Sequence, residues 1–379
     1  MTTLLVTGPG GAGTSTLSAA LAVRAARAGR STALVSRRPV DVGEVEGLRI
    51  VVPDPQQGFE ELWGSVGPAL SGALPDLALP PASSVVAPPG AAEVALLAEL
   101  ARVEADVVVL DAGPLDAALA LLALPGALRW WLGQALPTRL RMLGAVRTAA
   151  VRTGAVRSGP VDAVLSAVPV VERLLSRVDL GDPASTEVRL VTTPRAASVE
   201  AVRDALPVLA LHGQRPVAVH VRVLPEDGAG EWWAARTAEQ AGALTALADL
   251  APVARVPERA CTPADADDLA ALLTGDEPEP PHGLEVPAPV RVAGGWQLAV
   301  PLPFARRGAL GLTRWDDDLV LTVGGARRSL RLDALLRRCL VTGGSLVDAG
   351  TAGARLVIDF APDPQQWPAD LLAAEGSTA

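Results

Sequence analysis

Short apolar segments rich in β-branched residues alternate with alanine-rich stretches along most of the chain. The predicted strands are Leu4–Thr7, Ser31–Ser36, Val107–Asp111, Val188–Thr192, Val217–Leu224 and Val253–Val256. Strands that alternate with helices favour parallel pairing through βαβ crossovers. This pattern therefore predicts an α/β domain with a doubly wound, mostly parallel sheet.

The pattern changes after residue 274. Residues 275–287 are rich in proline, glycine and acidic side chains, which is typical of a linker. Short alternating segments separated by glycine and aspartate turns then predict a small all-β sandwich over 288–362, with Trp296 and Trp315 in its core. We expect the α/β domain to span 1–274, with a helical insertion at about 117–186, and the sandwich to be followed by a tail at 363–379.

A glycine-rich segment lies directly between the first predicted strand and the first predicted helix. We expect this helix to start near Thr14 and to end at Gly29, and Ser15 and Thr16 are able to cap its start. Strand, glycine turn and helix in this order are the context of a phosphate-binding P-loop, in which backbone N–H groups cradle the phosphates. The chain has no lysine, and Thr14 stands where a P-loop carries one. The sequence therefore predicts a phosphate cradle that lacks its usual charge. The cradle residues are Gly8, Gly10, Gly11, Gly13, Thr14, Ser15 and Thr16.

The same glycines also fit the weaker dinucleotide pattern Gly-x-Gly-x-x-Gly. An enzyme that binds NADP places arginine near the end of the second strand, where it contacts the 2′-phosphate. The chain has Ser36, Arg37 and Arg38 there. An NADP-binding protein is therefore one alternative.

Asp111 closes a fully apolar strand, at the place where P-loop enzymes hold magnesium. From Asp111 to Pro125 the chain resembles the switch segment of the arsenite-pump ATPase and tail-anchored-protein targeting ATPase family. The loop from Gly8 to Thr16 aligns with the loop of that family without gaps. Further similar segments are Val191–Pro194 with Glu200, Val221–Glu226, and, in the α-crystallin-like (small heat-shock protein-like) module that ends some members, Leu298–Pro303 and Leu319–Gly325.

The resemblance implies a homodimer that binds ATP or ADP, with Ser15 and Asp111 associated with magnesium. Several family residues are replaced: Pro9 and Thr14 stand in the places of two lysines, and Arg38 in the place of the catalytic aspartate. Val221 stands where the family has an asparagine that reads adenine. Because these groups stabilise phosphoryl transfer, we expect hydrolysis to be weak or absent, with Arg38 or its neighbour Arg37 supplying charge to a bound nucleotide. The alternative is an active, magnesium-dependent ATPase in which arginine replaces lysine.

Residues 117–160 contain no acidic side chain, and arginines alternate there with apolar residues near helical spacing. In the targeting branch of the family, helices after the switch segment form a groove for clients. The resemblance thus implies that Trp130, Trp131 and Leu132 face a hydrophobic peptide, a membrane-protein client or a lipid surface. The alternative is a core-facing helix with a solvated arginine face.

Composition limits the other possibilities. A net charge of −9 and a pI near 5.0 argue against general affinity for nucleic acid. The two cysteines and three histidines are scattered, so we expect no protein-built metal site, no zinc, and no cysteine cluster for a thiophilic metalloid such as arsenite. No run of about 20 uninterrupted apolar residues predicts a membrane span, and no secretory signal is visible, so we expect the cytoplasm.

Overall fold

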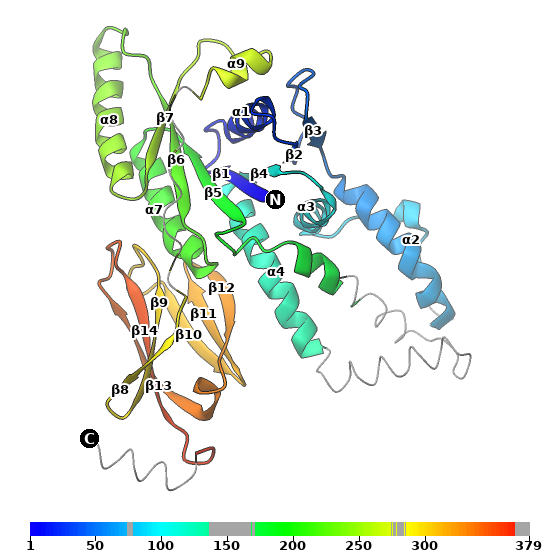
Figure 1. Ribbon diagram of the computed structural model, residues 1–379, viewed down its shortest axis with the longest axis vertical. Helices are drawn as coiled ribbons and strands as arrows, with labels where there is room; N and C mark the ends of the chain where they lie inside the picture. The colour runs from blue at the N-terminus through cyan, green and yellow to red at the C-terminus, as the bar shows by residue number, and fades with distance from the viewer. Residues whose placement is uncertain are drawn as a thin grey trace.

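The computed structural model describes residues 1–73, 79–135, 171–273 and 286–367, together with a few single positions between them. The larger part is built on one seven-stranded sheet in the order β3-β2-β4-β1-β5-β6-β7, in which all neighbours pair in parallel (Figure 1). Its strands are β1 (Thr2–Gly8), β2 (Thr32–Ser36), β3 (Leu48–Val51), β4 (Val107–Pro114), β5 (Thr186–Thr192), β6 (Pro216–Val223) and β7 (Val253–Pro257). The predicted doubly wound parallel sheet is confirmed.

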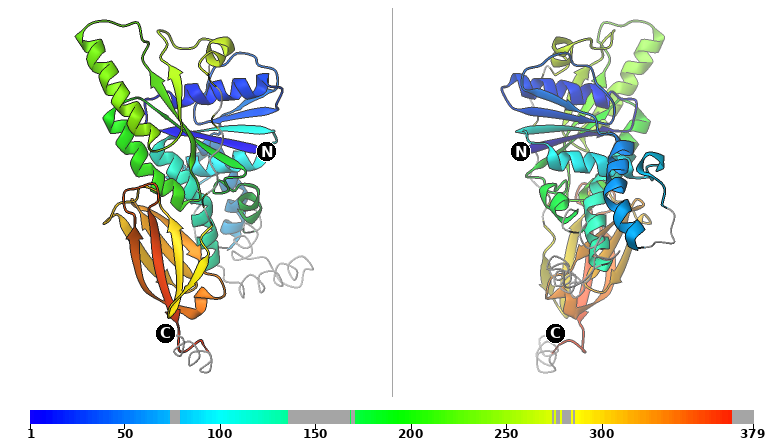
Figure 2. Two further views of the ribbon diagram at one scale, coloured as in Figure 1. Left: turned by 60° about the vertical axis from the view of Figure 1, so that its left-hand side comes forward. Right: turned by 90° about the vertical axis from the view of Figure 1, so that its right-hand side faces the viewer.

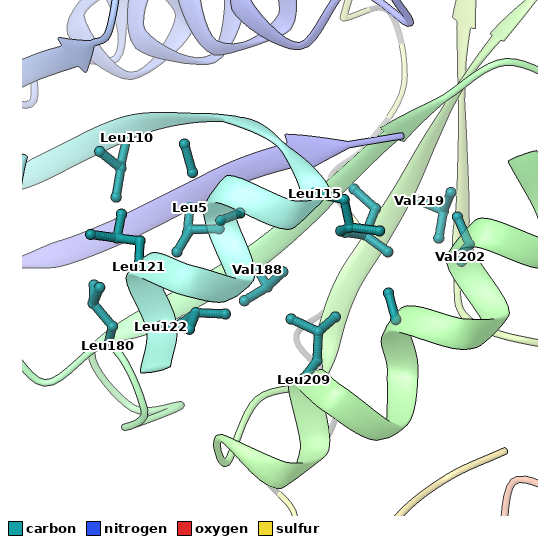
Figure 3. Packing of buried hydrophobic residues seen from close by; sticks show 14 of the residues in the cluster. Leu5, Leu110, Leu115, Leu121, Leu122, Leu180, Val188, Val202, Leu209 and Val219 are labelled. Atoms are coloured by element: carbon teal, nitrogen blue, oxygen red, sulfur yellow. The ribbon is translucent and has the colours of Figure 1, made fainter. Parts of the chain in front are cut away.

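Helices cover both faces of this sheet. One face packs against α1 (Thr14–Arg27) and α9 (Ala266–Ala270). The other packs against α3 (Ala91–Arg102), α4 (Leu115–Ala135), α7 (Ala196–Leu211) and α8 (Glu231–Ala248), and α2 (Pro55–Ala73) lies on α3. Figure 3 shows how leucines of α4 and α7 meet leucines and valines of the central strands in this second core. Burial of both faces explains why the central strands are almost uninterruptedly apolar.

The start of α1 differs in detail from the expectation. Helix α1 begins at Thr14 and ends before Gly29, which has a φ of 78°. Its N-cap, however, is Gly13 in a left-handed conformation, and no side chain caps it. Ser15 and Thr16 lie inside the first turn, so their predicted capping role is wrong. The first N–H groups of α1 consequently have no side-chain acceptor.

The C-terminal part forms two antiparallel sheets packed face to face, as predicted. One contains β10 (Leu310–Trp315), β11 (Asp318–Val323) and β12 (Ala326–Arg331); the other, in the order β13-β14-β9-β8, contains β8 (Pro289–Val292), β9 (Gly295–Pro301), β13 (Cys339–Val347) and β14 (Arg355–Pro362). Trp296 is buried in the sandwich core and lies 5.2 Å from the Trp367 ring, measured between centroids. Trp315 is 59% exposed, so its predicted core position is wrong. It is the last residue of the edge strand β10 and lies beside the tight turn to β11, where fewer neighbours cover it.

The sandwich is packed directly against the α/β domain (Figure 2). Val208 and Leu211 of α7 belong to the same buried cluster as the sandwich core, and Leu119 of α4 packs against that cluster. The Arg328 guanidinium of β12 donates to the backbone carbonyl of Leu211. Helix α4, which starts at the end of β4, runs beside β12. One continuous apolar interface thus joins the two parts.

The Arg306 guanidinium adds a surface ion pair to the Glu200 carboxylate of α7 at 2.8 Å. Glu200 therefore contacts the loop between β9 and β10 of the sandwich.

Candidate functional site

The carboxyl ends of β1, β2 and β4 meet at one edge of the sheet. Ser36 of β2 and Val6 of β1 both pair with Asp111 of β4, so the residues after these strands emerge together. Open α/β sheets bind ligands at this edge. The topology therefore brings the glycine loop, Asp111 and the Arg37–Arg38 pair to one place, as the sequence predicted for the loop and Asp111.

The loop between β1 and α1 depends on its glycines. Gly10, Gly11 and Gly13 have φ angles of 96°, 66° and 93°, a region that residues with a Cβ rarely adopt. Gly8 lies so close to β5 that a Cβ there would be 1.9 Å from the Val191 carbonyl oxygen. The loop is thus an open turn of backbone at the positive end of α1, which suits an anion. Thr14, Ser15 and Thr16 form the first turn of that helix.

Asp111 is a buried carboxylate whose oxygens already have donors. The Ser36 hydroxyl donates to Asp111 Oδ2 at 3.2 Å, and the Gly113 N–H donates to Asp111 Oδ1 at 3.1 Å. The Thr7 hydroxyl donates to the Gly113 carbonyl at 2.9 Å and so ties the segment after β4 to the end of β1. The aspartate is therefore held rigidly at the sheet edge.

Two arginines follow β2 and differ in their surroundings. Arg38 is exposed, and its backbone N–H lies 3.4 Å from the Ser36 hydroxyl. Arg37 is mostly buried, and its guanidinium donates to Glu93 Oε1 of α3 at 2.9 Å. The Arg37 side chain lies across Gly113, where a Cβ would be 3.3 Å from Arg37 Cδ. Sequence reasoning named Arg38 as the site residue and missed the contact of Arg37 with Glu93, because Glu93 is 56 residues away on another element.

A cavity of about 250 Å³ lies on the other side of the loop, between α1 and the ends of β6 and β7. Its lining includes Gly13 and Thr16 of the loop and, from the strand ends, His220, Arg222 and Glu258. Arg222 Nε lies 2.7 Å from Glu258 Oε2, and an Arg222 nitrogen lies 4.0 Å from the position of a Cβ on Gly13. This ion pair places a cation and a carboxylate beside the loop.

His220 is a buried, uncharged histidine at this cavity. Burial lowers its pKa to about 3, and the neighbouring Arg189 and Arg24 add to the shift. Neither ring nitrogen has a hydrogen-bond partner among the described residues. Val221, the next residue, points to the opposite face and is fully buried in the core with α7 and α8. His220, Arg222 and Glu258 are thus among the polar groups that line this cavity, and none of the three had been predicted as a site residue.

The residues proposed to contact clients lie near the end of α4. Trp131 is 64% exposed, whereas Trp130 and Leu132 are partly buried. The two indole rings form an edge-to-face pair with centroids 5.0 Å apart. Arg129 donates to the Leu175 carbonyl at 2.8 Å. The remaining arginines of the predicted basic segment, from Arg139 to Arg157, lie outside the described residues.

Helix α4 also differs from the expectation about membrane spans. Its window Leu115–Gln134 is long and apolar enough to cross a membrane, by length and composition alone, and 28% of the window is buried. The sequence argument required an uninterrupted apolar run, and this helix contains Asp116 and Arg129. Among the described residues no group of three or more His, Cys, Asp or Glu side chains is placed to hold a metal ion.

Sheet order, loop and buried aspartate define an α/β protein of the P-loop NTPase type. Comparison with known families agrees. Residues 72–257 match the model of the anion-transporting ATPase family, and residues 293–360 match that of the HSP20-like domain found in ArsA. The first match begins beyond the glycine loop.

Relatives of similar length support the same grouping. The chain is 36% identical to Uncharacterized protein SCO2128 of Streptomyces coelicolor, over 97% of this chain and 99% of the relative. It is 31% identical to Protein Rv2184c of Mycobacterium tuberculosis, over 96% and 97%, and 24% identical to Putative arsenical pump-driving ATPase 1 of Aquifex aeolicus, over 89% and 95%. The chain belongs to the ArsA-like ATPase family, in the form that carries a C-terminal HSP20-like domain.

Proposed function

We propose that this protein binds ATP or ADP at the glycine loop and hydrolyses ATP weakly or not at all. The observation that carries the proposal is the loop itself: its left-handed glycines and uncapped α1 N-terminus form a cradle for phosphate in a chain without lysine. Backbone N–H groups can hold phosphate. Phosphoryl transfer also needs cations that stabilise the negative charge of the transition state. The family loop supplies these cations as lysines, and this loop has none.

The residues of the site fit a nucleotide in distinct roles. We assign the phosphates to Gly8, Gly10, Gly11, Gly13 and the first turn of α1, and the base to the cavity beside the loop. Ser15 and Asp111 are the groups proposed to associate with magnesium, which neutralises phosphate charge when bound. Arg38, exposed at the same edge, supplies positive charge toward the nucleotide.

A client-binding role completes the proposal. The exposed Trp131 on the apolar helix α4, which starts at the Asp111 segment, supports a surface for a hydrophobic peptide, a membrane-protein client or a lipid. We infer a holder or targeting factor that works as a cytoplasmic homodimer. Titration of an apolar, fluorescently labelled helical peptide, with and without nucleotide, tests this role; binding that does not respond to changes at Trp131 contradicts it.

The nucleotide proposal is tested by equilibrium dialysis with ATP and ADP, with and without magnesium, followed by a phosphate-release assay on the same sample. Retention of ATP without release of phosphate supports a nucleotide-binding pseudoenzyme. Steady magnesium-dependent release, reduced by Asp111→Ala or Arg38→Ala, supports instead the active ATPase in which arginine replaces lysine. Preferential retention of NADP supports the dinucleotide alternative, for which Arg38 is exposed at the edge of the site.

A further inference from the structure

The Arg37 guanidinium has both a paired and an unpaired hydrogen-bond donor among the described residues. Its guanidinium bonds to Glu93 through one terminal nitrogen, at 2.9 Å. Its Nε–H is buried and has no hydrogen-bond partner among the described residues. A buried donor without an acceptor disfavours the arrangement that contains it, because the group has lost its contact with water. The paired conformation of Arg37 is therefore weakened by its own geometry.

The surroundings of Arg37 belong to the phosphate edge of the site. Arg37 follows Ser36, which pairs with Asp111 across the sheet and donates to its carboxylate. The side chain crosses Gly113, whose N–H also bonds to Asp111 and whose carbonyl is bonded by Thr7 at the end of β1. The Arg37 side chain thus lies against Gly113, which is hydrogen-bonded both to Asp111 and to Thr7 at the end of β1.

Glu93 is the residue that pairs with the Arg37 guanidinium. It lies in the first turn of α3, and its side chain is 18% exposed, against 23% for Arg37. The pair is largely buried, and a phosphate group offers arginine more charge and more acceptor oxygens than the single carboxylate of Glu93 does. A third phosphate at the loop is therefore able to compete for Arg37.

We propose that Arg37 distinguishes a nucleoside triphosphate from a diphosphate at this site, and that Glu93 is the acceptor it leaves when a terminal phosphate binds. The inference rests on the proposed nucleotide binding and goes beyond it by assigning the response to the terminal phosphate to one residue. Departure of Arg37 removes an ion-pair partner from the first turn of α3. Because α3 contacts both α2 and α4, loss of this ion pair at the sheet edge affects the layer that these three helices form.

The test compares the affinities of a non-hydrolysable β,γ-imido ATP and of ADP, each with magnesium, for the full-length protein and its variants by calorimetry. We expect the wild type to bind the triphosphate more tightly. Arg37→Gln should weaken triphosphate binding about tenfold and leave ADP binding within about twofold, as expected for loss of one charge-assisted contact. Glu93→Gln should tighten triphosphate binding by about threefold to fivefold, because the competing acceptor has lost its charge.

Glu99→Gln is the matched control, because Glu99 lies on the same helix and pairs with Arg102 at 2.7 Å on the surface. It should change neither affinity. Thermal unfolding of each variant without nucleotide separates an effect on the fold from an effect on the ratio of the two affinities. An unchanged ratio in Arg37→Gln, or no gain in Glu93→Gln, overturns the inference and leaves the proposed function intact. Failure of the wild type to bind either nucleotide overturns both.

Discussion

The two buried histidines make the stability of this protein sensitive to mild acid. Burial lowers the pKa of His220 to about 3 and that of His212 to about 4, with neighbouring arginines adding to each shift. Both groups have a pKa near 6.5 in the unfolded chain. The folded state therefore excludes a proton that the unfolded chain binds, so this stabilisation is present above pH 6.5 and is lost as the pH falls below it.

The size of the effect follows from the interval between the unfolded pKa and the working pH. At pH 5 that interval is about 1.5 units for each histidine, which corresponds to about 2 kcal/mol of lost stability per group at about 1.4 kcal/mol per unit. Both folded pKa values lie below pH 5, so each histidine contributes almost its full share. The pair should thus lower the free energy of unfolding by about 4 kcal/mol between pH 7 and pH 5.

Urea unfolding at pH 7, 6 and 5 measures this loss directly. In His220→Gln the loss between pH 7 and pH 5 should shrink by about 2 kcal/mol, whatever the variant's stability at pH 7, because glutamine does not titrate. His212→Gln should give a similar reduction. A loss that is the same in wild type and in both variants would contradict this prediction and would show that these histidines are not buried as neutral groups.

Three further substitutions test separate parts of the structure. Gly8→Ala should lower stability by about 1–3 kcal/mol in urea unfolding, because the added Cβ meets the Val191 carbonyl; unchanged stability would contradict the close approach of loop and β5. Arg328→Gln should cost about 1–3 kcal/mol by leaving the Leu211 carbonyl without its donor, and calorimetry should then separate the melting of the two domains. Trp131→Ala should change stability by less than about 0.5 kcal/mol yet weaken binding of an apolar peptide; a large loss of stability would place Trp131 in the core.

Strand pattern and loop chemistry were enough to predict much of the fold. The six predicted strands all occur. Parallel strands buried on both faces are nearly continuous apolar runs, which can be recognised without knowing which strands pair. Strand β3 was missed: Leu48–Val51 is short and only half-buried at the edge of the sheet. Trp315 was placed wrongly because an alternating pattern fixes which residues share a face only if the register at the turn is known.

The charged part of the site could be predicted less well. The glycines of the loop and Asp111 follow directly from motif and strand end, and they meet where expected. The pairs Arg37–Glu93 and Arg222–Glu258 join elements that are far apart in sequence, and their formation depends on how helices and loops pack over the sheet edge. The capping of α1 depended on the conformation of Gly13, which leaves the first turn free of side-chain acceptors.

The position of α4 links the site to the rest of the molecule. The helix begins directly after the segment held by Asp111, and Leu119, near its start, packs against the core that α7 shares with the β-sandwich. Its surface near Trp131 is the candidate client surface. Movement of the Asp111 segment would therefore act on the helix that carries this surface and on its contact with the C-terminal domain.

Whether a lysine-free loop still cradles phosphate is measured by calorimetric titration of magnesium-ATP into the wild type and, side by side, into Gly8→Ala. We expect saturable binding to the wild type that is weakened at least about tenfold in the variant, because a displaced loop no longer presents its N–H groups to the phosphates. Absence of binding to the wild type, or equal binding to both proteins, would contradict it.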